Sequence, residues 1–202
     1  IWNHAKDWQS EIIDDIKSKF NILEVYEITW QINAFTDNLQ RFYGTKLPVN
    51  SPKEIRIGRG PFTLIIVEDE DPIYQERRTR ASRKETVNTN IFDSKTQYRH
   101  WTKKTTNTPD LVHASNSTKE TNRDLTLLLG RNIENYFKNK PRKWNGQIEK
   151  LSQDLHGYNG WSDMEEMLEI LNSTIRYVIL RNYEILPNQH TTKEHKDIDI
   201  LI

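Results

Sequence analysis

Two carboxylates near the end of the chain have a spacing that suits a metal ion. Asp197 and Asp199 alternate with Ile198 and Ile200, as residues of a β-strand would. Side chains at positions i and i+2 of a strand point to the same face, so these two carboxylates can hold a divalent cation between them. A strand at the edge of a sheet with two solvated acids is the plainer alternative. The chemistry that the pair predicts is the binding of a divalent cation.

A second group of reactive residue types surrounds a histidine in the middle of the chain. His113 follows a short apolar run, and Ser115, Ser117 and Asp124 come after it. Ser117 and Glu120 match the S/T-x-x-E pattern of a helix N-terminus, so a helix is predicted to begin behind the histidine. One interpretation is a strand-end histidine that bonds Asp124 for structural reasons. The other is a reactive imidazole.

The segment from Leu111 to Asp124 resembles the active-site signature of nucleoside diphosphate kinases. In this resemblance His113 corresponds to the phosphorylated histidine, Ser115 to the serine that follows it, and Asp124 to the acid that hydrogen-bonds the ring. The order of elements over roughly residues 1–130 is similar as well. The resemblance implies a ferredoxin-like fold, a nucleoside triphosphate as substrate, and phosphoryl transfer through the imidazole.

The resemblance also implies cations and donors beside the transferring phosphoryl group, because its oxygens have to be neutralised. It places an arginine on the helix before the histidine, for which Arg99 is the candidate, followed by Thr102 and Lys103. Two differences favour an alternative, a degenerate module without catalysis that serves nucleotide binding or protein–protein assembly. The lysine that the family carries after its first strand has no counterpart, and Asp110 stands where the family has asparagine.

The end of the chain resembles the D-x-D strand of nucleotidyltransferase-fold enzymes, in which a helix and a strand precede the acidic pair. Here the predicted strand Tyr177–Leu180 comes before Asp197 and Asp199, with Arg181-Asn182 in place of the usual Gly-Ser. This resemblance implies Mg²⁺-dependent nucleotidyl transfer in the second part of the chain.

Hydrophobic periodicity predicts the elements that must position these residues. Helices are expected where apolar residues recur at helical spacing, and strands where they alternate or form short β-branched runs. A further strand before Trp8 would complete a four-stranded antiparallel sheet of the ferredoxin-like kind. The expected helices are 8–20, 34–43, 91–101, 117–129, 144–156 and 164–171, the expected strands are 22–30, 62–67, 111–114, 177–180 and 198–202, and the basic stretch 74–85 is expected to be a loop.

Composition excludes several classes of protein. The 202 residues carry 29 basic and 29 acidic side chains, which argues against a nucleic-acid binder, although the Arg77–Lys84 run supplies a local basic patch. The absence of cysteine rules out disulfides and thiolate chemistry. No apolar run reaches the roughly 18 residues of a membrane span, and no secretion signal is visible, so a cytoplasmic protein is predicted.

Together these patterns predict an α+β protein in two domains. Residues 1–137 would form the kinase-like domain with a ferredoxin-like antiparallel sheet, and residues 138–202 a linker, helices and the first strands of an incomplete nucleotidyltransferase-like domain. The chain starts at Ile1 without a methionine and stops within the predicted strand at Ile202, which predicts a piece of a longer polypeptide. The expected partner is a nucleotide or another phosphorylated small molecule, and homo-oligomerisation stays open.

Overall fold

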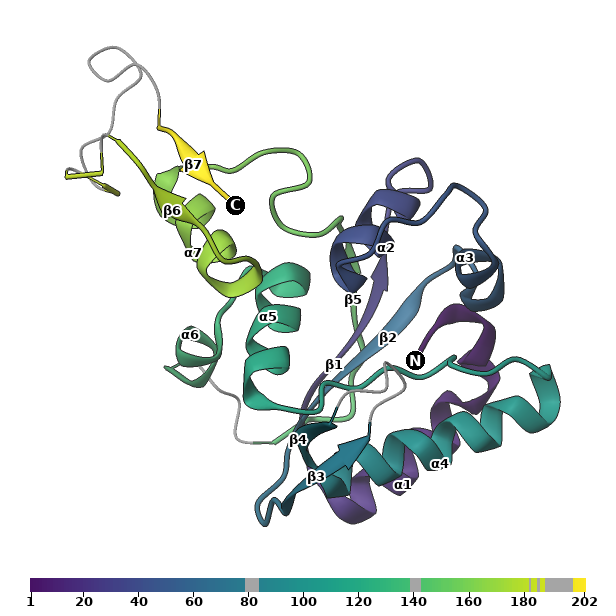
Figure 1. The fold of residues 1–202 in the computed structure, drawn as a ribbon. Coiled ribbons are helices and arrows are strands. Elements are labelled where there is room, and N and C mark those ends of the chain that lie inside the picture. The colour runs from purple at the N-terminus through teal and green to yellow at the C-terminus, as the bar shows by residue number, and fades with distance from the viewer. Residues whose placement is uncertain (79–83, 139–142, 182, 185, 188–197) are drawn as a thin grey trace. The chain divides into compact units, whose positions relative to one another are not determined.

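The computed structural model describes the chain except for residues 79–83, 139–142, 182, 185 and 188–197 (Figure 1). Its contacts divide the chain into two compact units. The first consists of Ile1–Glu120 and Asn139–Asp154, and the second of Thr121–Lys138 and Leu155–Ile202. The domain boundary predicted at residue 137 stays a prediction. Each unit is described by itself below.

A three-stranded sheet forms the centre of the first unit, in the order β2-β1-β5. The middle strand β1 runs antiparallel to β2, from the pair Asn21↔Glu68 to the pair Ile28↔Phe62. On its other edge β1 runs parallel to β5. Five of the nine residues of β1 are buried, and its two glutamates, Glu24 and Glu27, lie at half-buried positions. The strands are β1 (Asn21–Thr29), β2 (Phe62–Glu68) and β5 (Glu149–Ser152).

The helices of the first unit follow from local signals. Ile12, Ile13 and Ile16 give α1 a buried apolar face, and Gly44 ends α2 with φ at 60°, a backbone conformation that glycine adopts without strain. Ser51 caps α3 by accepting a hydrogen bond from the Glu54 N–H. The elements are η1 (Asn3–Trp8), α1 (Gln9–Lys19), α2 (Phe35–Tyr43), α3 (Pro52–Ile57) and α4 (Thr89–Thr106), with a separate hairpin of β3 (Tyr74–Arg78) and β4 (Lys84–Asn88).

Buried aromatic rings pack together around Trp30 of the first unit. The Trp30 ring lies 4.8 Å from that of Phe62 and 5.3 Å from that of Phe35, both edge-on. Trp2 extends this group, because its ring lies 5.0 Å from Phe62. Aromatic pairs in such geometries add to the stabilisation that comes from area burial alone. This packing holds α2 beside the sheet, and α2 ends next to the candidate site.

A buried carboxylate joins the end of β5 to α2. One Asp154 oxygen accepts hydrogen bonds from the Asn38 side chain at 2.7 Å and from the Gln31 N–H at 3.0 Å. Asn38 has no exposed surface. Asn38→Ala should therefore lower the free energy of unfolding by about 2 kcal/mol, because a buried charged acceptor loses one of its two donors. Urea unfolding measures this, and the exposed Asn33→Ala is the control. Equal midpoints for the two variants would contradict the prediction.

The second unit is mainly helical. It contains most of α5 (Thr118–Leu129), with α6 (Ile133–Lys138) and α7 (Met164–Thr174). Asp163 caps α7 by accepting from the Glu166 N–H. The short strands β6 (Val178–Ile179) and β7 (Ile200–Leu201) pair antiparallel. Among the described residues, no helix is both long and apolar enough to cross a membrane.

The mixture of helices and small sheets confirms the predicted α+β class, but the four-stranded ferredoxin-like sheet is not confirmed. The N-terminal segment forms the 3₁₀-helix η1 where a strand was expected, and residues 111–114 form no strand. The predicted helix 144–156 is wrong, because these residues supply β5, which pairs with the edge of β1. Tertiary pairing overrides local periodicity there. The described ends of the predicted loop 74–85 form the β3–β4 hairpin.

Candidate functional site

His113 lies in the segment between α4 and α5, and the backbone around it is held in place. Leu111 and Val112, directly before it, are buried. The Leu111 carbonyl accepts a hydrogen bond from the Trp2 N–H at 2.9 Å. The Arg99 Nε donates to the Val112 carbonyl at 2.7 Å. These bonds replace the strand pairing that the sequence predicts at this position.

The His113 ring packs against the end of α2 on one side. Its centroid lies 5.3 Å from the Phe42 ring and 5.7 Å from the Tyr43 ring, in edge-to-face geometry. The side chain keeps 23% of its surface exposed. An imidazole that rests on an aromatic wall and is still accessible can reach a ligand.

Glu120 is the carboxylate of the first unit that faces this ring. Its Oε1 lies 3.9 Å from Nε2 of His113. Its Oε2 accepts a hydrogen bond from the Asn116 N–H at 2.6 Å, and its own N–H donates to the Ser117 hydroxyl at 3.3 Å. This confirms the predicted helix cap, with the return bond made to Asn116. The cap therefore fixes a carboxylate beside the histidine.

The acid that the sequence assigns to this role is Asp124, one helical turn after Glu120 on α5. Asp124 belongs to the second unit, where its Oδ1 accepts a hydrogen bond from Arg123 at 3.1 Å. The predicted contact between Asp124 and the ring stays a prediction, as does the role of Ser115, which lies two residues after the histidine. The sequence reasoning did not identify Glu120, although the capping pattern that positions it was recognised.

Two cations of α4 bind the backbone on either side of His113. Lys95 and Arg99 are four residues apart and share one face of the helix. Arg99 donates to the carbonyl before the histidine, at Val112, and Lys95 Nζ donates to the carbonyl after it, at Ala114, over 3.2 Å. Lys95 also donates to the Asn116 side chain. Positive charge is thus concentrated beside the ring.

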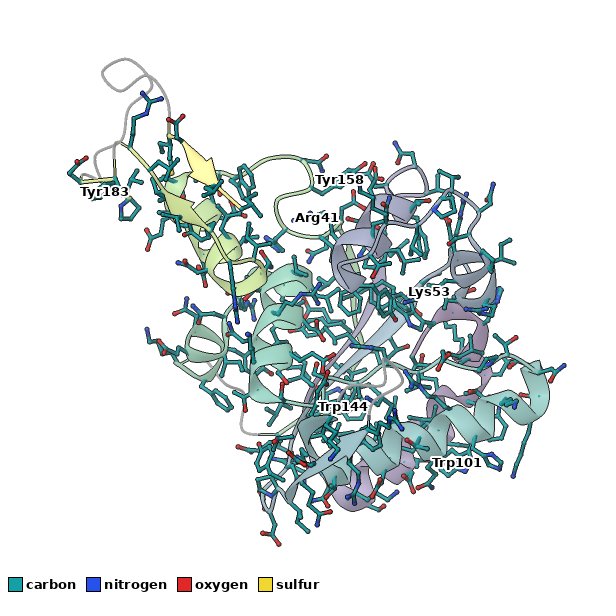
Figure 2. The ribbon with its side chains drawn as sticks, viewed as in Figure 1. Arg41, Lys53, Trp101, Trp144, Tyr158 and Tyr183 are labelled. Carbon is teal, nitrogen blue, oxygen red and sulfur yellow. The ribbon has the colours of Figure 1, made fainter. Side chains whose placement is uncertain are left out.

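A third cation, Lys53, comes from α3 (Figure 2). Its Nζ lies 2.7 Å from the centroid of the Tyr43 ring, which itself contacts His113. Burial lowers the pKa of Lys53 to about 8, while nearby Asp110 acts in the opposite direction. Asp110 also lies 3.5 Å from the Arg99 guanidinium, and its φ is 71°. The predicted negative charge of Asp110 therefore faces two cations.

Burial also lowers the pKa of Lys95 to about 8, with Arg99 acting in the same direction. Its folded pKa is below the ordinary value of 10.5, so above pH 8 the folded chain has lost a proton that the unfolded chain still holds. The free energy of unfolding should therefore rise with pH towards about 10, by at most about 1.4 kcal/mol per pH unit for this lysine. Urea midpoints at increasing pH measure the slope, and Lys95→Met should reduce it. Identical slopes in the two proteins would contradict this.

The other predicted phosphate-binding residues differ in accessibility. Thr102 is fully buried, and its hydroxyl donates to the Arg99 carbonyl within α4 at 3.3 Å. In this position Thr102 supports the helix. Lys103 is exposed near the end of α4. Of the three predicted residues, the structure brings only Arg99 to the backbone next to His113. Binding by Thr102 and Lys103 stays a prediction.

The predicted metal pair is described in part. Asp197 lies outside the described residues. Asp199 is described, and its Oδ2 accepts from the Arg181 Nε at 2.5 Å. This oxygen is held by a guanidinium, and Mg²⁺ binding by the pair stays a prediction. The arginine that replaces the expected Gly-Ser is thus the residue that binds the acid.

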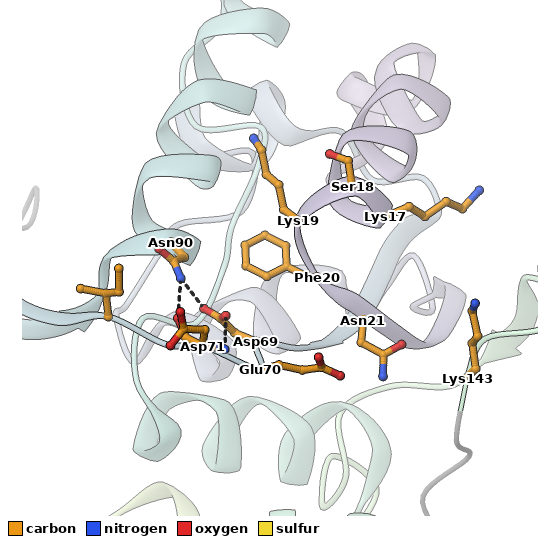
Figure 3. Close-up of a pocket in the computed structure, with 11 residues that line it drawn as sticks. Lys17, Ser18, Lys19, Phe20, Asn21, Asp69, Glu70, Asp71, Asn90 and Lys143 are labelled. Atoms are coloured by element: carbon orange, nitrogen blue, oxygen red, sulfur yellow. Dashed lines mark hydrogen bonds between the residues drawn. The ribbon is translucent and has the colours of Figure 1, made fainter.

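A separate hollow of about 770 Å³ lies at the C-terminal end of α1 (Figure 3). Lysines line one part of it and the acidic turn Asp69–Asp71 another, so its charges are mixed. Asp69 Oδ2 already accepts from the side chains of Asn88 and Asn90 at 2.8 and 3.0 Å. The acidic turn is therefore tied to the start of α4 by hydrogen bonds. His113 does not line this hollow.

Comparison with models of protein families, with curated proteins and with solved structures found no match for this chain. A proposal for the function therefore rests on the residues that the structure brings together. In the first unit these are His113, Glu120, Lys53, Lys95 and Arg99, which we call the His113 site.

Proposed function

We propose that the chain transfers a phosphoryl group from a nucleoside triphosphate through the imidazole of His113. The observation that carries the proposal is the position of Lys95 and Arg99, which bind the carbonyls on either side of this partly exposed histidine. Cations placed around a nucleophile stabilise the charge that develops on a transferring phosphoryl group. Two of the three cations of the site have a pKa near 8, and such perturbed groups gather at functional sites.

In the proposed reaction Glu120 accepts the hydrogen bond of the Nε2 proton, and the Nδ1 lone pair attacks the γ-phosphorus. The bond from that phosphorus to the bridging oxygen breaks, and the nucleoside diphosphate leaves with the bonding electrons. The product is a phosphohistidine, whose positive ring the Glu120 carboxylate stabilises. An anionic phosphate oxygen of the acceptor then attacks the same phosphorus and restores the neutral imidazole.

Labelling with a nucleoside triphosphate tests the proposal. The full chain is incubated with ATP labelled in its γ-phosphoryl group, and the protein is then treated with acid or with alkali. A phosphohistidine loses its label in acid and keeps it in alkali, whereas phosphoserine and phosphothreonine survive acid. Label with the first behaviour supports the proposal, and the absence of any label would refute it.

A module that binds nucleotide without transferring phosphoryl is the second candidate. The pairing of Asp110 with Arg99 favours it, because the carboxylate partly neutralises a cation that a phosphate would use. Such a module would bind ATP without becoming labelled. Calorimetry with ATP, carried out beside the labelling experiment, distinguishes the two candidates.

A further inference from the structure

The described part of the basic run lies on a two-stranded arm that the His113 site does not use. We call the hairpin of β3 and β4 the β3–β4 arm. Five cations and two acids give residues 76–85 a net charge of +3, although the whole chain is neutral. Four of these five cations are arginine. The basic residues of the run are Arg77, Arg78, Arg80, Arg83 and Lys84, of which Arg80 and Arg83 lie outside the described residues.

The base of the arm is fixed to the first unit. Val87 is fully buried, and the Thr89 N–H and hydroxyl both donate to the Ile73 carbonyl, at 2.8 and 3.0 Å. The strands pair only with each other in the described part of the chain. The arm is therefore a positioned element with two open edges.

Strand register places an aromatic ring and a basic pair on one face of the arm. Tyr74 and Arg78 point to the same side because they are four residues apart, and Lys84 lies directly opposite Arg78. Tyr74 is 52% exposed, and Arg78 and Lys84 are exposed as well. Buried Val87 belongs to the other face, since it pairs with Gln75. About 13 Å separate the strand positions of the ring and the basic pair.

Two like charges directly across a hairpin destabilise it. On the other face Arg77 lies opposite Glu85, a favourable pair, so the repulsion of Arg78 and Lys84 is confined to the exposed face. An anion bound between them would remove this repulsion. Arginine binds phosphate oxygens in a forked geometry, and an exposed aromatic ring can stack on a base.

We propose that this face of the β3–β4 arm binds single-stranded nucleic acid, with phosphates at Arg78 and Lys84 and a base on Tyr74. Glu76 lies between Tyr74 and Arg78 on the same strand and restricts phosphate contacts to the far end of the arm. This binding is separate from phosphoryl transfer at His113.

Fluorescence anisotropy with a labelled oligouridylate of about 20 nucleotides tests the proposal. The full chain should bind it with an affinity that falls steeply between about 50 and 200 mM salt. Arg78→Glu places a carboxylate opposite Lys84, so it should weaken binding about 10-fold or more while leaving thermal stability unchanged or higher. Tyr74→Ala should weaken binding about 10-fold without changing the salt dependence.

Lys46→Glu is the matched control, because it makes the same charge change at an exposed position of the first unit. Binding by the control should stay within about twofold of the original protein, since a remote surface charge is screened at these salt concentrations. Equal losses in Arg78→Glu and Lys46→Glu would overturn the proposal. Absence of binding at the lowest salt would also overturn it, as would equally tight binding of polyglutamate, which would point to an acidic protein segment.

Discussion

In the His113→Ala variant, the acid-labile phosphoryl label is expected to fall by more than about 1,000-fold. The reason is that the imidazole is the nucleophile of the proposed reaction, and alanine has no atom that can form the phosphorus–nitrogen bond. The ring rests on Phe42 and Tyr43 with part of its surface exposed, so its removal leaves a shallow gap at the surface. Incubation with γ-labelled ATP and alkaline gel separation measures the label.

His100→Ala is the control for this variant, because His100 is an exposed histidine of α4. It should become labelled like the original protein. Circular dichroism of both variants establishes that they are folded. Label of the same amount and acid lability in His113→Ala would contradict the proposed role of this residue.

Lys53→Met should slow the labelling about 100- to 1,000-fold, the usual effect of removing one electrostatic donor from a transition state. Methionine keeps much of the length of the side chain above the Tyr43 ring but removes the charge. Lys53→Arg, which keeps the charge, should be slowed much less. In the original protein the rate should decline above about pH 8, because Lys53 then loses its proton.

Lys46→Met is the matched control, since Lys46 is exposed and carries the same charge change. Its rate should stay within about twofold of the original protein, as is usual for exposed positions. Two results would count against a role for Lys53 in transfer. One is equal slowing in both variants, and the other is a Lys53→Arg protein as slow as Lys53→Met.

The parts of the fold that could be predicted from the sequence depend on local signals. The helix that became α5 was predictable because its cap is local: Ser117 accepts from the Glu120 N–H, and Glu120 accepts in return from the Asn116 N–H. The strand β2 was predictable from its short apolar run. In contrast, β5 was predicted as helix, because only pairing with β1, more than 100 positions earlier in the sequence, makes it a strand.

The residues of the His113 site also divide into those that a local sequence signal identifies and those that only folding brings together. His113 and Arg99 could be chosen from the sequence, and the structure places an Arg99 nitrogen on the carbonyl next to His113. Lys53 gave no sequence signal, because folding alone brings α3 to the Tyr43 ring. Glu120 did belong to a recognisable sequence pattern, but that pattern predicts a helix cap and not a residue beside the histidine. Its second oxygen faces the histidine only because the cap turns the side chain back towards the preceding segment.

The most direct measurement is the position of the phosphoryl group in the labelled chain. After reaction with ATP, the protein is digested at alkaline pH and its phosphopeptides are sequenced by mass spectrometry. The proposed mechanism predicts a phosphate on the His113 ring. A phosphate on another histidine, or on a serine such as Ser115, would contradict it.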